Sequence, residues 1–178
     1  MRGDELCPRP LLSMTRSIRI DAPPEDVWPW VAQIGQNRGG FYSYAWFENL
    51  FGARIVNADR VVPEFQITAP GDEVSIHPKQ PPFEAVEVDA PRALVLYGRG
   101  GLVALTSWTL ELRDDGGATE LSARMRIDRG DRGPIGALLR RVLLNLLLRP
   151  GHALMERQML RGIRRRAERA VPARNPDA

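Results

Sequence analysis

The chain has 178 residues, 43% of them hydrophobic and 26% charged, which is typical of one globular domain and excludes disorder outside the chain ends. The formal net charge is +3, and the single cysteine excludes an internal disulfide. The most apolar stretch, Val142 to Leu148, is far shorter than the ~20 residues of a membrane-spanning helix.

Both ends of the chain mix charge and proline without a hydrophobic period, as loose termini do. We therefore expect one folded domain over residues 13–171, with flexible segments at 1–12 and 172–178. The first segment contains Asp4, Glu5 and the single Cys7 but no apolar stretch. A signal peptide is therefore not expected, and the predicted compartment is the cytoplasm.

The first strand is predicted at Arg16 to Ile20, where apolar and polar residues alternate. Pro23 and Pro24 end it, and a short helix follows that ends at Gly35. The apolar residues of this helix recur at helical spacing and form one face: Val27, Trp30, Val31 and Ile34.

A glycine-containing loop at 36–40 leads to a second short helix, which Ser43 can cap and Gly52 can close. Residues 53–72 contain two turns. The stretch between these turns, 61–66, is predicted to be a strand followed by a bend.

The pattern from residue 73 onward predicts consecutive strands at 73–77, 83–89, 93–98, 103–113 and 118–128. In the last two, apolar residues occupy one side and polar residues the other, which is typical of an antiparallel sheet with one buried face. The sequence Asp-Asp-Gly-Gly at 114–117 predicts a hairpin between them.

After Gly133 the hydrophobic period becomes helical again, and helices are predicted at 134–149 and 152–170. The apolar stripe of the second is formed by Met155, Met159, Ile163 and Ala167. Because the sheet has one apolar face and this helix one apolar stripe, we expect the helix to lie on the sheet. The predicted fold class is therefore α+β: a curved antiparallel sheet of about six to seven strands around a long C-terminal helix, with two short helices after the first strand. Such an arrangement leaves room for an apolar pocket.

Three motifs carry a resemblance to a known family. They are Ile20 to Trp30 (IDAPPEDVWPW), Gly35 to Tyr44 (GQNRGGFYSY) and Trp46 to Asn49 (WFEN). These motifs resemble the START-like, Bet v 1-like superfamily, and within it the SRPBCC, polyketide cyclase-like proteins. The resemblance covers about residues 18–72 and implies a helix-grip fold with an apolar pocket under the C-terminal helix. It does not imply one chemistry, because the superfamily contains carriers, cyclases and proteins of unknown role.

No metal ion or cofactor is expected. A metal site needs several ligands that converge, whereas His77, His152 and Cys7 are far apart in the sequence. The glycines at 98–101 lack the spacing of a dinucleotide-binding loop.

The basic residues are concentrated late in the chain, and all but Lys79 are arginine. Six of them lie on the predicted last helix: Arg157, Arg161, Arg164, Arg165, Arg166 and Arg169. A nucleic-acid-binding protein can have such a cluster. Cations near the C-terminal end of a helix are stabilising in any case, so we interpret the cluster as a solvated helix face and expect no nucleic-acid partner.

Aromatic side chains are densest at residues 41–47. Two interpretations of Tyr42, Tyr44 and Trp46 stay open: they pack in the core, or they surround the mouth of a ligand pocket and offer polar groups for a hydrogen bond.

Glu48 and Asn49 follow on the same short helix. Burial would raise the pKa of Glu48 and let it act as a general acid or base, which makes it the candidate catalytic residue. The alternative is that Glu48 or Asn49 makes a structural hydrogen bond to the loop around Asn57 or Glu64.

On the sheet and the last helix, Trp108, Met125, Met155 and Met159 are predicted to form a soft cavity wall, with ordinary core packing as the alternative. The helix at 134–149 is apolar over a broad face. It can complete the cavity, or it can mediate a homodimer or a peripheral contact.

Three functions remain, in order of preference. The first is binding of a small hydrophobic, lipid-like or aromatic ligand in an internal cavity. The second is a cyclase- or dehydratase-type enzyme acting on a polyketide-like substrate there. The third is an interaction module built from 134–149 and the arginine-rich helix. The predicted ligand-binding residues are Tyr42, Tyr44, Trp46, Glu48, Asn49, Trp108, Met125, Met155 and Met159.

Overall fold

The computed structural model describes residues 1–50, 52–100, 105–128, 145–146 and 149–174, with the side chains of residues 47–48 and 171–174 excepted. In chain order its elements are η1 (Asp4–Leu6), β1 (Pro10–Ile20), α1 (Pro24–Val31), α2 (Ala45–Leu50), η2 (Pro63–Phe65), β2 (Glu73–Val74), β3 (Phe83–Asp89), β4 (Ala93–Arg99), β5 (Leu105–Asp115), β6 (Ala118–Asp128) and α4 (Arg149–Arg174), where η marks a 3-10 helix.

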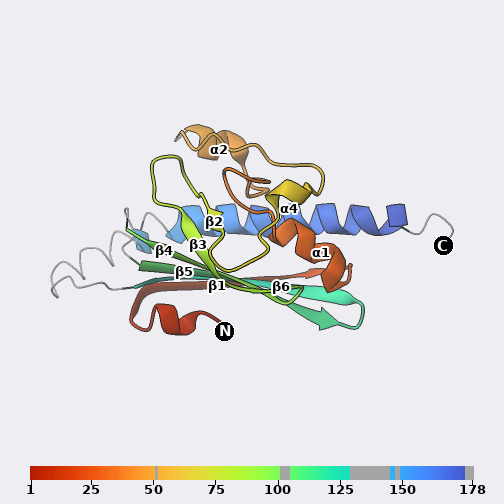
Figure 1. Ribbon diagram of the computed structural model, residues 1–178, viewed down its shortest axis with the longest axis horizontal. Helices are drawn as coiled ribbons and strands as arrows, with labels where there is room; N and C mark the ends of the chain where they lie inside the picture. The colour runs from red at the N-terminus through yellow and green to blue at the C-terminus, as the bar shows by residue number, and fades with distance from the viewer. Residues whose placement is uncertain (51, 101–104, 129–144, 147–148, 175–178) are drawn as a thin grey trace.

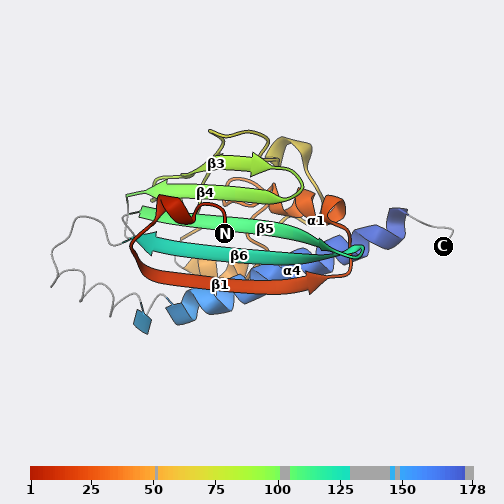
Figure 2. The same cartoon turned by 90° about the horizontal axis from the view of Figure 1, so that it is seen from below.

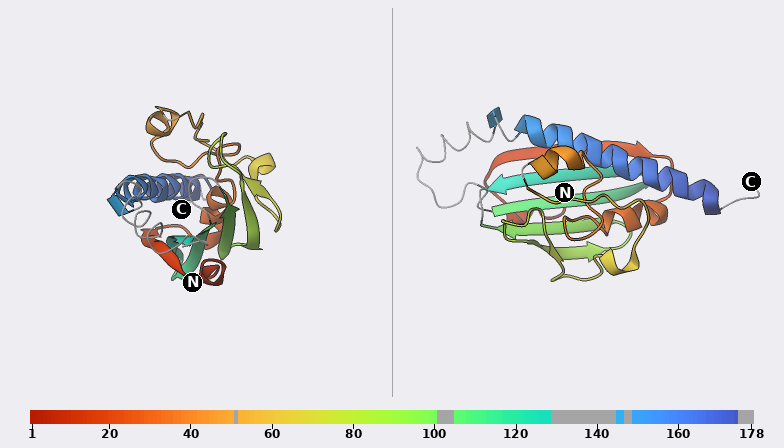
Figure 3. Two further views of the ribbon diagram at one scale, coloured as in Figure 1. Left: turned by 90° about the vertical axis from the view of Figure 1, so that its left-hand side faces the viewer. Right: turned by 90° about the horizontal axis from the view of Figure 1, so that it is seen from above.

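The described strands form one six-stranded antiparallel sheet in the order β1-β6-β5-β4-β3-β2. The long helix α4 lies across one face of this sheet, and α1 and α2 lie on the same side (Figures 1 and 3). The predicted α+β class and helix-grip arrangement are therefore confirmed, including the two short helices after the first strand.

The strands form where side-chain alternation and turn residues agree. The predicted strands 83–89 and 118–128 are confirmed as β3 and β6. β5 and β6 are joined by a two-residue turn in which Gly116 and Gly117 have φ of 66° and 88°. Residues with side chains rarely adopt this conformation, which is why two glycines stand there.

The core lies between the inner face of the sheet and the helices. Leu110 and Leu121 on the sheet, and Ile163 and Ala167 on α4, are fully buried. The predicted apolar stripe of the last helix therefore faces the sheet. Close packing also needs Gly162, because a side chain there would collide with the backbone of Tyr42. None of the helices in the described part of the chain is long and apolar enough to cross a membrane.

The prediction of a loose segment at residues 1–12 is wrong. Residues 10–12 belong to β1, and the segment before them packs on the outer face of the sheet, where Cys7 is fully buried (Figure 2). Asp4 forms ion pairs with Arg124 at 2.7 Å and Arg126 at 3.2 Å, both on β6. The charges at the start of the chain therefore pair with the outer face of the sheet instead of facing solvent.

This N-terminal cover also changes the outer face of β5. Ser107 and Thr109 were expected on a wet face, but they are 2% and 1% exposed. The Thr109 hydroxyl donates a hydrogen bond to the carbonyl of Arg2 at 2.9 Å. The alternation of polar and apolar residues therefore identifies the outer face of a strand, but it does not show that this face is exposed to solvent.

Three further expectations concern the remaining segments. The stretch 61–66 contains the 3-10 helix η2 instead of the predicted strand, since Pro63 lacks the N–H that a strand would use. Helix α4 extends to Arg174, into the predicted loose end at 172–178, whose last four residues lie outside the described part. The helix expected at 134–149 also lies almost entirely outside it.

Candidate functional site

A small apolar pocket lies between the inner face of the sheet and the first half of α4. Its volume is about 170 Å³. It is lined by Phe41, Ser43, Ile76, Phe83, Trp108, Met125, His152, Met155, Glu156 and Met159.

The fold brings these side chains together in two ways. On the sheet, Trp108 of β5 and Met125 of β6 are direct cross-strand partners, so both project from the same face. On α4, the pocket residues follow the spacing i, i+3, i+4 and i+7, which places them on one side of a helix. These residues are His152, Met155, Glu156 and Met159.

Glu156 is the most unusual lining residue, because it is an acid that is only 3% exposed. Neither of its carboxylate oxygens has a hydrogen-bond partner among the described residues. Its nearest charge is Arg16 of β1, whose Nε lies 3.5 Å from Oε2. Burial raises the pKa of Glu156 to about 7, against the opposing effect of the Arg16 charge.

His152 lies one helical turn before Glu156, with its Nδ1 3.9 Å from Oε2 of the acid. Burial, with a smaller contribution from Arg16, lowers the pKa of His152 to about 4. The imidazole is therefore neutral near pH 7, where the carboxyl group is close to half protonated. This pair can accept or donate a proton inside an apolar pocket.

Four of the nine predicted ligand-binding residues meet in this pocket: Trp108, Met125, Met155 and Met159. The indole Nε1 of Trp108 is buried without a hydrogen-bond partner among the described residues, so the wall contains a donor as well as apolar surface. Whether these residues contact a ligand stays a prediction.

The aromatic residues Tyr42, Tyr44 and Trp46 are not in the pocket lining. Tyr42 is 2% exposed and packs against Trp30 of α1, with a ring-centroid distance of 6.0 Å. The guanidinium of Arg166 lies 4.7 Å from the centre of the Tyr42 ring. Tyr44 packs against Trp46, which is 70% exposed. The core interpretation of Tyr42 is therefore confirmed, and the pocket uses its neighbours Phe41 and Ser43 instead.

Asn49 has a structural role in the loop that follows α2. Its side-chain amide donates a hydrogen bond to the carbonyl of Ile55 at 3.0 Å and accepts one from the Ile55 N–H at 2.5 Å. The alternative that Asn49 makes a structural hydrogen bond is therefore confirmed. Its partner is Ile55, two residues before Asn57, around which the partner was expected. The side chain of Glu48 lies outside the described part of the structure, so its catalytic role stays a prediction.

Glu156 and His152 were not among the residues predicted from the sequence. Both have the helical spacing of Met155 and Met159, which was recognised as the buried stripe. His152 lies three residues before Met155, and Glu156 lies three residues before Met159, so helical spacing alone would place both on the buried side. Neither was predicted there, because charged residues on an amphipathic helix usually mark its solvent side.

Comparison with known proteins identifies the fold and family. The family model described as "Polyketide cyclase / dehydrase and lipid transport" matches residues 12–168. Among curated protein sequences, no significant match is found. Among solved structures, the chain is similar to the ZhuI aromatase/cyclase from Streptomyces sp. R1128, with 14% identity, a TM-score of 0.51 and coverage of 92% of this chain and 97% of that chain. At this identity, the likeness establishes the fold alone.

Two other similar structures have lower TM-scores. The Polyketide_cyc-like protein Cgl2372 from Corynebacterium glutamicum is 17% identical, with a TM-score of 0.45 and coverage of 93% of this chain and 96% of that chain. The protein MLL2253 from Mesorhizobium loti is 11% identical, with a TM-score of 0.49 and coverage of 89% and 98%.

The family match extends from β1 into α4 and so includes both walls of the pocket. It confirms the resemblance to the START-like, SRPBCC proteins that the sequence motifs indicate. It also agrees with the prediction of a domain that binds a small hydrophobic ligand in an internal cavity. The chain belongs to the polyketide cyclase / dehydrase and lipid transport family.

Proposed function

We propose that the protein binds a small, ring-sized hydrophobic ligand in the pocket between the sheet and α4, with Glu156 as its polar anchor. The observation that carries this proposal is a buried carboxyl group without a hydrogen-bond partner among the described residues, in a pocket lined mainly by aromatic and methionine side chains. A buried polar group of this kind is costly unless it is paired. A ligand with a hydrogen-bond donor would supply the partner.

The pocket volume limits the size of the guest. A dry protein cavity of ~150 Å³ holds one benzene molecule, and the volume here is about 170 Å³. The pocket therefore suits one aromatic ring, or the ring end of a longer molecule.

The affinity for one ring can be estimated from the area that it buries. A ring that buries about 150 Å² gains about 4 kcal/mol at ~25 cal/mol per Å², before the cost of immobilising it is subtracted, so a Kd of about 1 mM is the tightest that burial alone supports. A hydrogen bond to a charged group adds about 1.5–3 kcal/mol. Indole has an N–H donor and benzofuran, which has almost the same size and shape, does not, so indole is expected to bind at least tenfold more tightly at pH 8, where Glu156 is ionised.

The five methionines make this testable by NMR with 13C-labelled methionine methyl groups. Met125, Met155 and Met159 line the pocket, whereas Met1 does not and serves as the internal control. Met14 does not line the pocket but is the cross-strand partner of Met125, so its signal is expected to shift less than the pocket signals. Added indole is expected to shift the three pocket signals and to leave Met1 unchanged. Equal shifts at all five, or no shift at the three, would contradict the proposal.

A pair of adjacent substitutions on α4 provides the matched control. Met155→Trp fills the pocket, while Leu154→Trp places the same side chain at a position that is 54% exposed. Indole binding is expected to be lost in the first variant and kept in the second. If both variants bind indole as the wild type does, the ligand site lies elsewhere.

A second candidate function is acid–base catalysis on the bound ring, with Glu156 in the role that the sequence analysis assigned to Glu48. It is supported by the pKa of Glu156 near 7 and by the neutral His152 beside it. In the cyclase or dehydratase type of reaction, a base removes a proton next to a carbonyl group and an acid returns one to an oxygen atom. Both steps need a carboxyl group that is present in both protonation states.

Exchange of the α-protons of cyclohexanone with D2O tests this function, because this ring fits the pocket and the exchange needs only a base. The wild type is expected to accelerate the exchange above the rate in buffer, with a half-maximal effect near pH 7. Glu156→Gln is expected to abolish the acceleration while the methionine signals still report ring binding. Exchange that is equally fast in this variant would rule out Glu156 as the base.

Two finer predictions accompany the proposed function. The segment 134–149, which the sequence predicts to be an apolar helix, is proposed as a homodimer or peripheral contact. The cytoplasm is proposed as the compartment, because the single Cys7 forms no disulfide. The oligomeric state in solution, compared between the full chain and a variant with serine at three leucines of 134–149, tests the contact.

A further inference from the structure

A second, larger depression lies between β1 and α4, apart from the apolar pocket, and its walls are strongly basic. Its volume is about 580 Å³, and it shares no lining residue with the apolar pocket. Four arginines line it: Arg16 from β1, and Arg157, Arg161 and Arg164 from α4. We call these four residues and the space between them the arginine groove.

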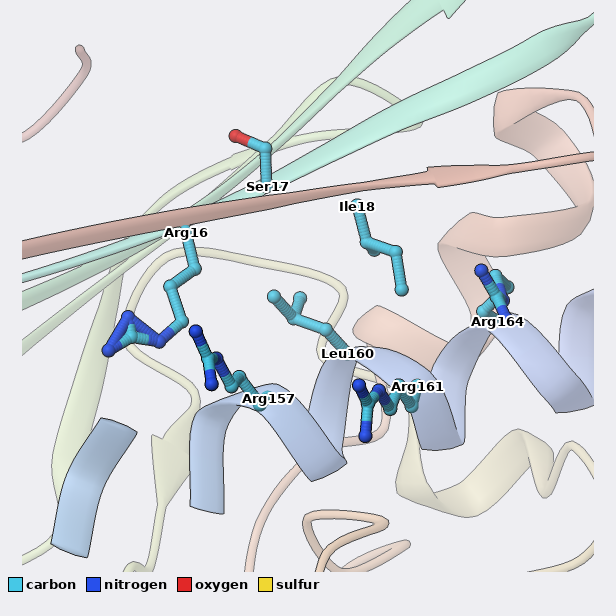
Figure 4. Close-up of a pocket in the computed structure, with 7 residues that line it drawn as sticks. All are labelled: Arg16, Ser17, Ile18, Arg157, Leu160, Arg161 and Arg164. Atoms are coloured by element: carbon cyan, nitrogen blue, oxygen red, sulfur yellow. The ribbon is translucent and has the colours of Figure 1, made fainter. Parts of the chain in front are cut away.

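The arginine groove is assembled by the local geometry of two elements. The three helical arginines follow the spacing i, i+4 and i+7, which places them on one face of α4. β1 is an edge strand of the sheet formed by the described strands, so no further described strand covers this side. In Figure 4 the side chains of Arg16 and Arg157 extend toward each other across the groove, and Ile18 and Leu160 project into the space between strand and helix, where they add apolar surface.

Among the residues that the structure describes, few counter-charges neutralise the positive charge in the groove. The residues that line it include no carboxylate, and Arg157 and Arg161 have no ion pair or hydrogen bond among the described residues. Arg164 has a distant ion pair with Glu168, at 3.8 Å. Like charges that lie on one depression with few counter-charges repel one another, so the arrangement favours binding of an anion.

Arg16 is held in place from behind. Its Nε lies 3.5 Å from Oε2 of Glu156 and donates a long hydrogen bond of 3.4 Å to the carbonyl of Ala153. Its Nη1 and Nη2 atoms have no hydrogen-bond partner among the described residues. The contacts of Nε thus orient the guanidinium group, while Nη1 and Nη2 remain available to donate two hydrogen bonds to an oxyanion.

The size of the groove indicates what kind of anion fits. Arg157 and Arg164 are seven residues apart, about 10 Å along a helix, and the fourth arginine faces them from the strand. A compact phosphate group with several equivalent oxygens matches the planar donors of Arg16 and Arg157, which extend toward each other, with the charges of Arg161 and Arg164 nearby. An extended nucleic-acid backbone would need a longer basic track than this.

We propose that the arginine groove binds a phosphomonoester group, carried by a small soluble molecule or by a lipid headgroup. This site goes beyond the proposed function, since it lies outside the apolar pocket and requires no ligand there. Glycerol 3-phosphate and vesicles that contain phosphatidic acid present the same phosphate group from the two sources.

The test is a titration with glycerol 3-phosphate at constant ionic strength, followed through the arginine Nε–Hε NMR signals. Arg157→Gln with Arg161→Gln removes two charges from the groove. Arg165→Gln with Arg169→Gln removes two charges from another side of the same helix, where these arginines line a separate depression with Asp59. The groove variant is expected to raise the Kd at least tenfold, and the control variant less than threefold.

The outcomes separate the proposal from its alternatives. Glycerol 3-phosphate binding that only the groove variant weakens supports a soluble phosphomonoester, and co-flotation with phosphatidic acid vesicles but not with phosphatidylcholine vesicles supports the lipid source. Equal weakening in both variants would show general charge attraction and overturn the proposal. Tighter binding of a single-stranded oligonucleotide than of glycerol 3-phosphate or the vesicles would overturn it as well. Unchanged thermal unfolding of both variants confirms that the comparison concerns binding.

Discussion

Replacing Glu156 by glutamine is expected to stabilise the protein at high pH and to leave its stability unchanged in acid. The folded-state pKa of about 7 lies above the ordinary value of 4.5, so the folded state holds its proton over a range in which the unfolded state has lost it. The free energy of unfolding therefore falls as the pH rises through this range. Glutamine resembles the protonated acid and does not ionise, so the variant avoids this loss.

The size of the effect follows from the interval between the two pKa values. One pH unit corresponds to ~1.4 kcal/mol, so the interval of about 2.5 units gives a penalty of about 3 kcal/mol that is fully present above pH 7. Glu156→Gln is thus expected to be about 3 kcal/mol more stable than the wild type at pH 8, and equal to it below pH 4.5.

Urea unfolding followed by circular dichroism at pH 4.5, 6 and 8 measures this difference. Glu168→Gln is the matched control, because Glu168 lies on the same helix in a partly exposed ion pair with Arg164. Its effect is expected to stay within about 0.5–1 kcal/mol at each pH. A Glu156→Gln variant that is less stable than the wild type at pH 8 would refute the burial argument, since it would mean that the ionised carboxylate is well solvated or paired.

The neighbouring histidine is expected to show the opposite pH dependence. Its pKa falls from 6.5 to about 4 on folding, so its contribution to stability is present above pH 6.5 and is lost as the pH falls toward 4. Between about pH 4.5 and 6.5 the effects of Glu156 and His152 therefore nearly cancel in the wild type. In His152→Gln only the effect of Glu156 remains, so the free energy of unfolding is expected to fall as the pH rises. The same urea unfolding series measures this fall. A flat curve in that variant would contradict the assignment.

Two further predictions concern the packing that positions the site, and urea unfolding measures both. Gly162→Ala is expected to lower the free energy of unfolding by about 2 kcal/mol, because the new methyl group collides with the backbone of Tyr42. In the control Gly151→Ala, the added atom meets no neighbour within 4 Å, so this variant is expected to be neutral or stabilising. A stabilised Gly162→Ala would show that Gly162 and Tyr42 are not in contact. Asn57→Ala is expected to lower the free energy of unfolding by about 2 kcal/mol. The Asn57 side chain accepts a hydrogen bond from the Tyr42 N–H at 2.7 Å and donates one to the Ser43 carbonyl at 3.1 Å, and alanine makes neither. An unchanged stability would mean that this loop is held by other contacts.

The fold was largely predictable from the sequence because its strands and last helix are specified by local patterns. The strand boundaries at 83–89 and 118–128 follow from alternation that ends at turn residues, and the buried stripe of α4 follows from helical spacing. The docking of the N-terminal segment was not predictable in this way. It depends on ion pairs between residues more than a hundred positions apart, such as Asp4 and Arg124.

The candidate site was predictable only for its apolar half. Met155 and Met159 were identified because apolar residues at helical spacing are usually buried. Glu156 has the same spacing, but its burial is decided by what covers that part of α4 and not by its own preference. The arginines show the reverse case: their position on the last helix was evident, whereas Arg16, which completes their groove, comes from a strand at the other end of the chain.

The single cysteine lies where its reactivity can report whether the N-terminal segment is bound to the sheet or detached from it. The Cys7 thiol is fully buried against the outer face of the sheet, and burial raises its pKa, so it reacts with an alkylating reagent only when that segment detaches. Because the chain has no other thiol, the labelling rate of the unmodified protein measures that local opening directly. Comparing this rate with the rate of global unfolding would show whether the segment separates before the sheet does.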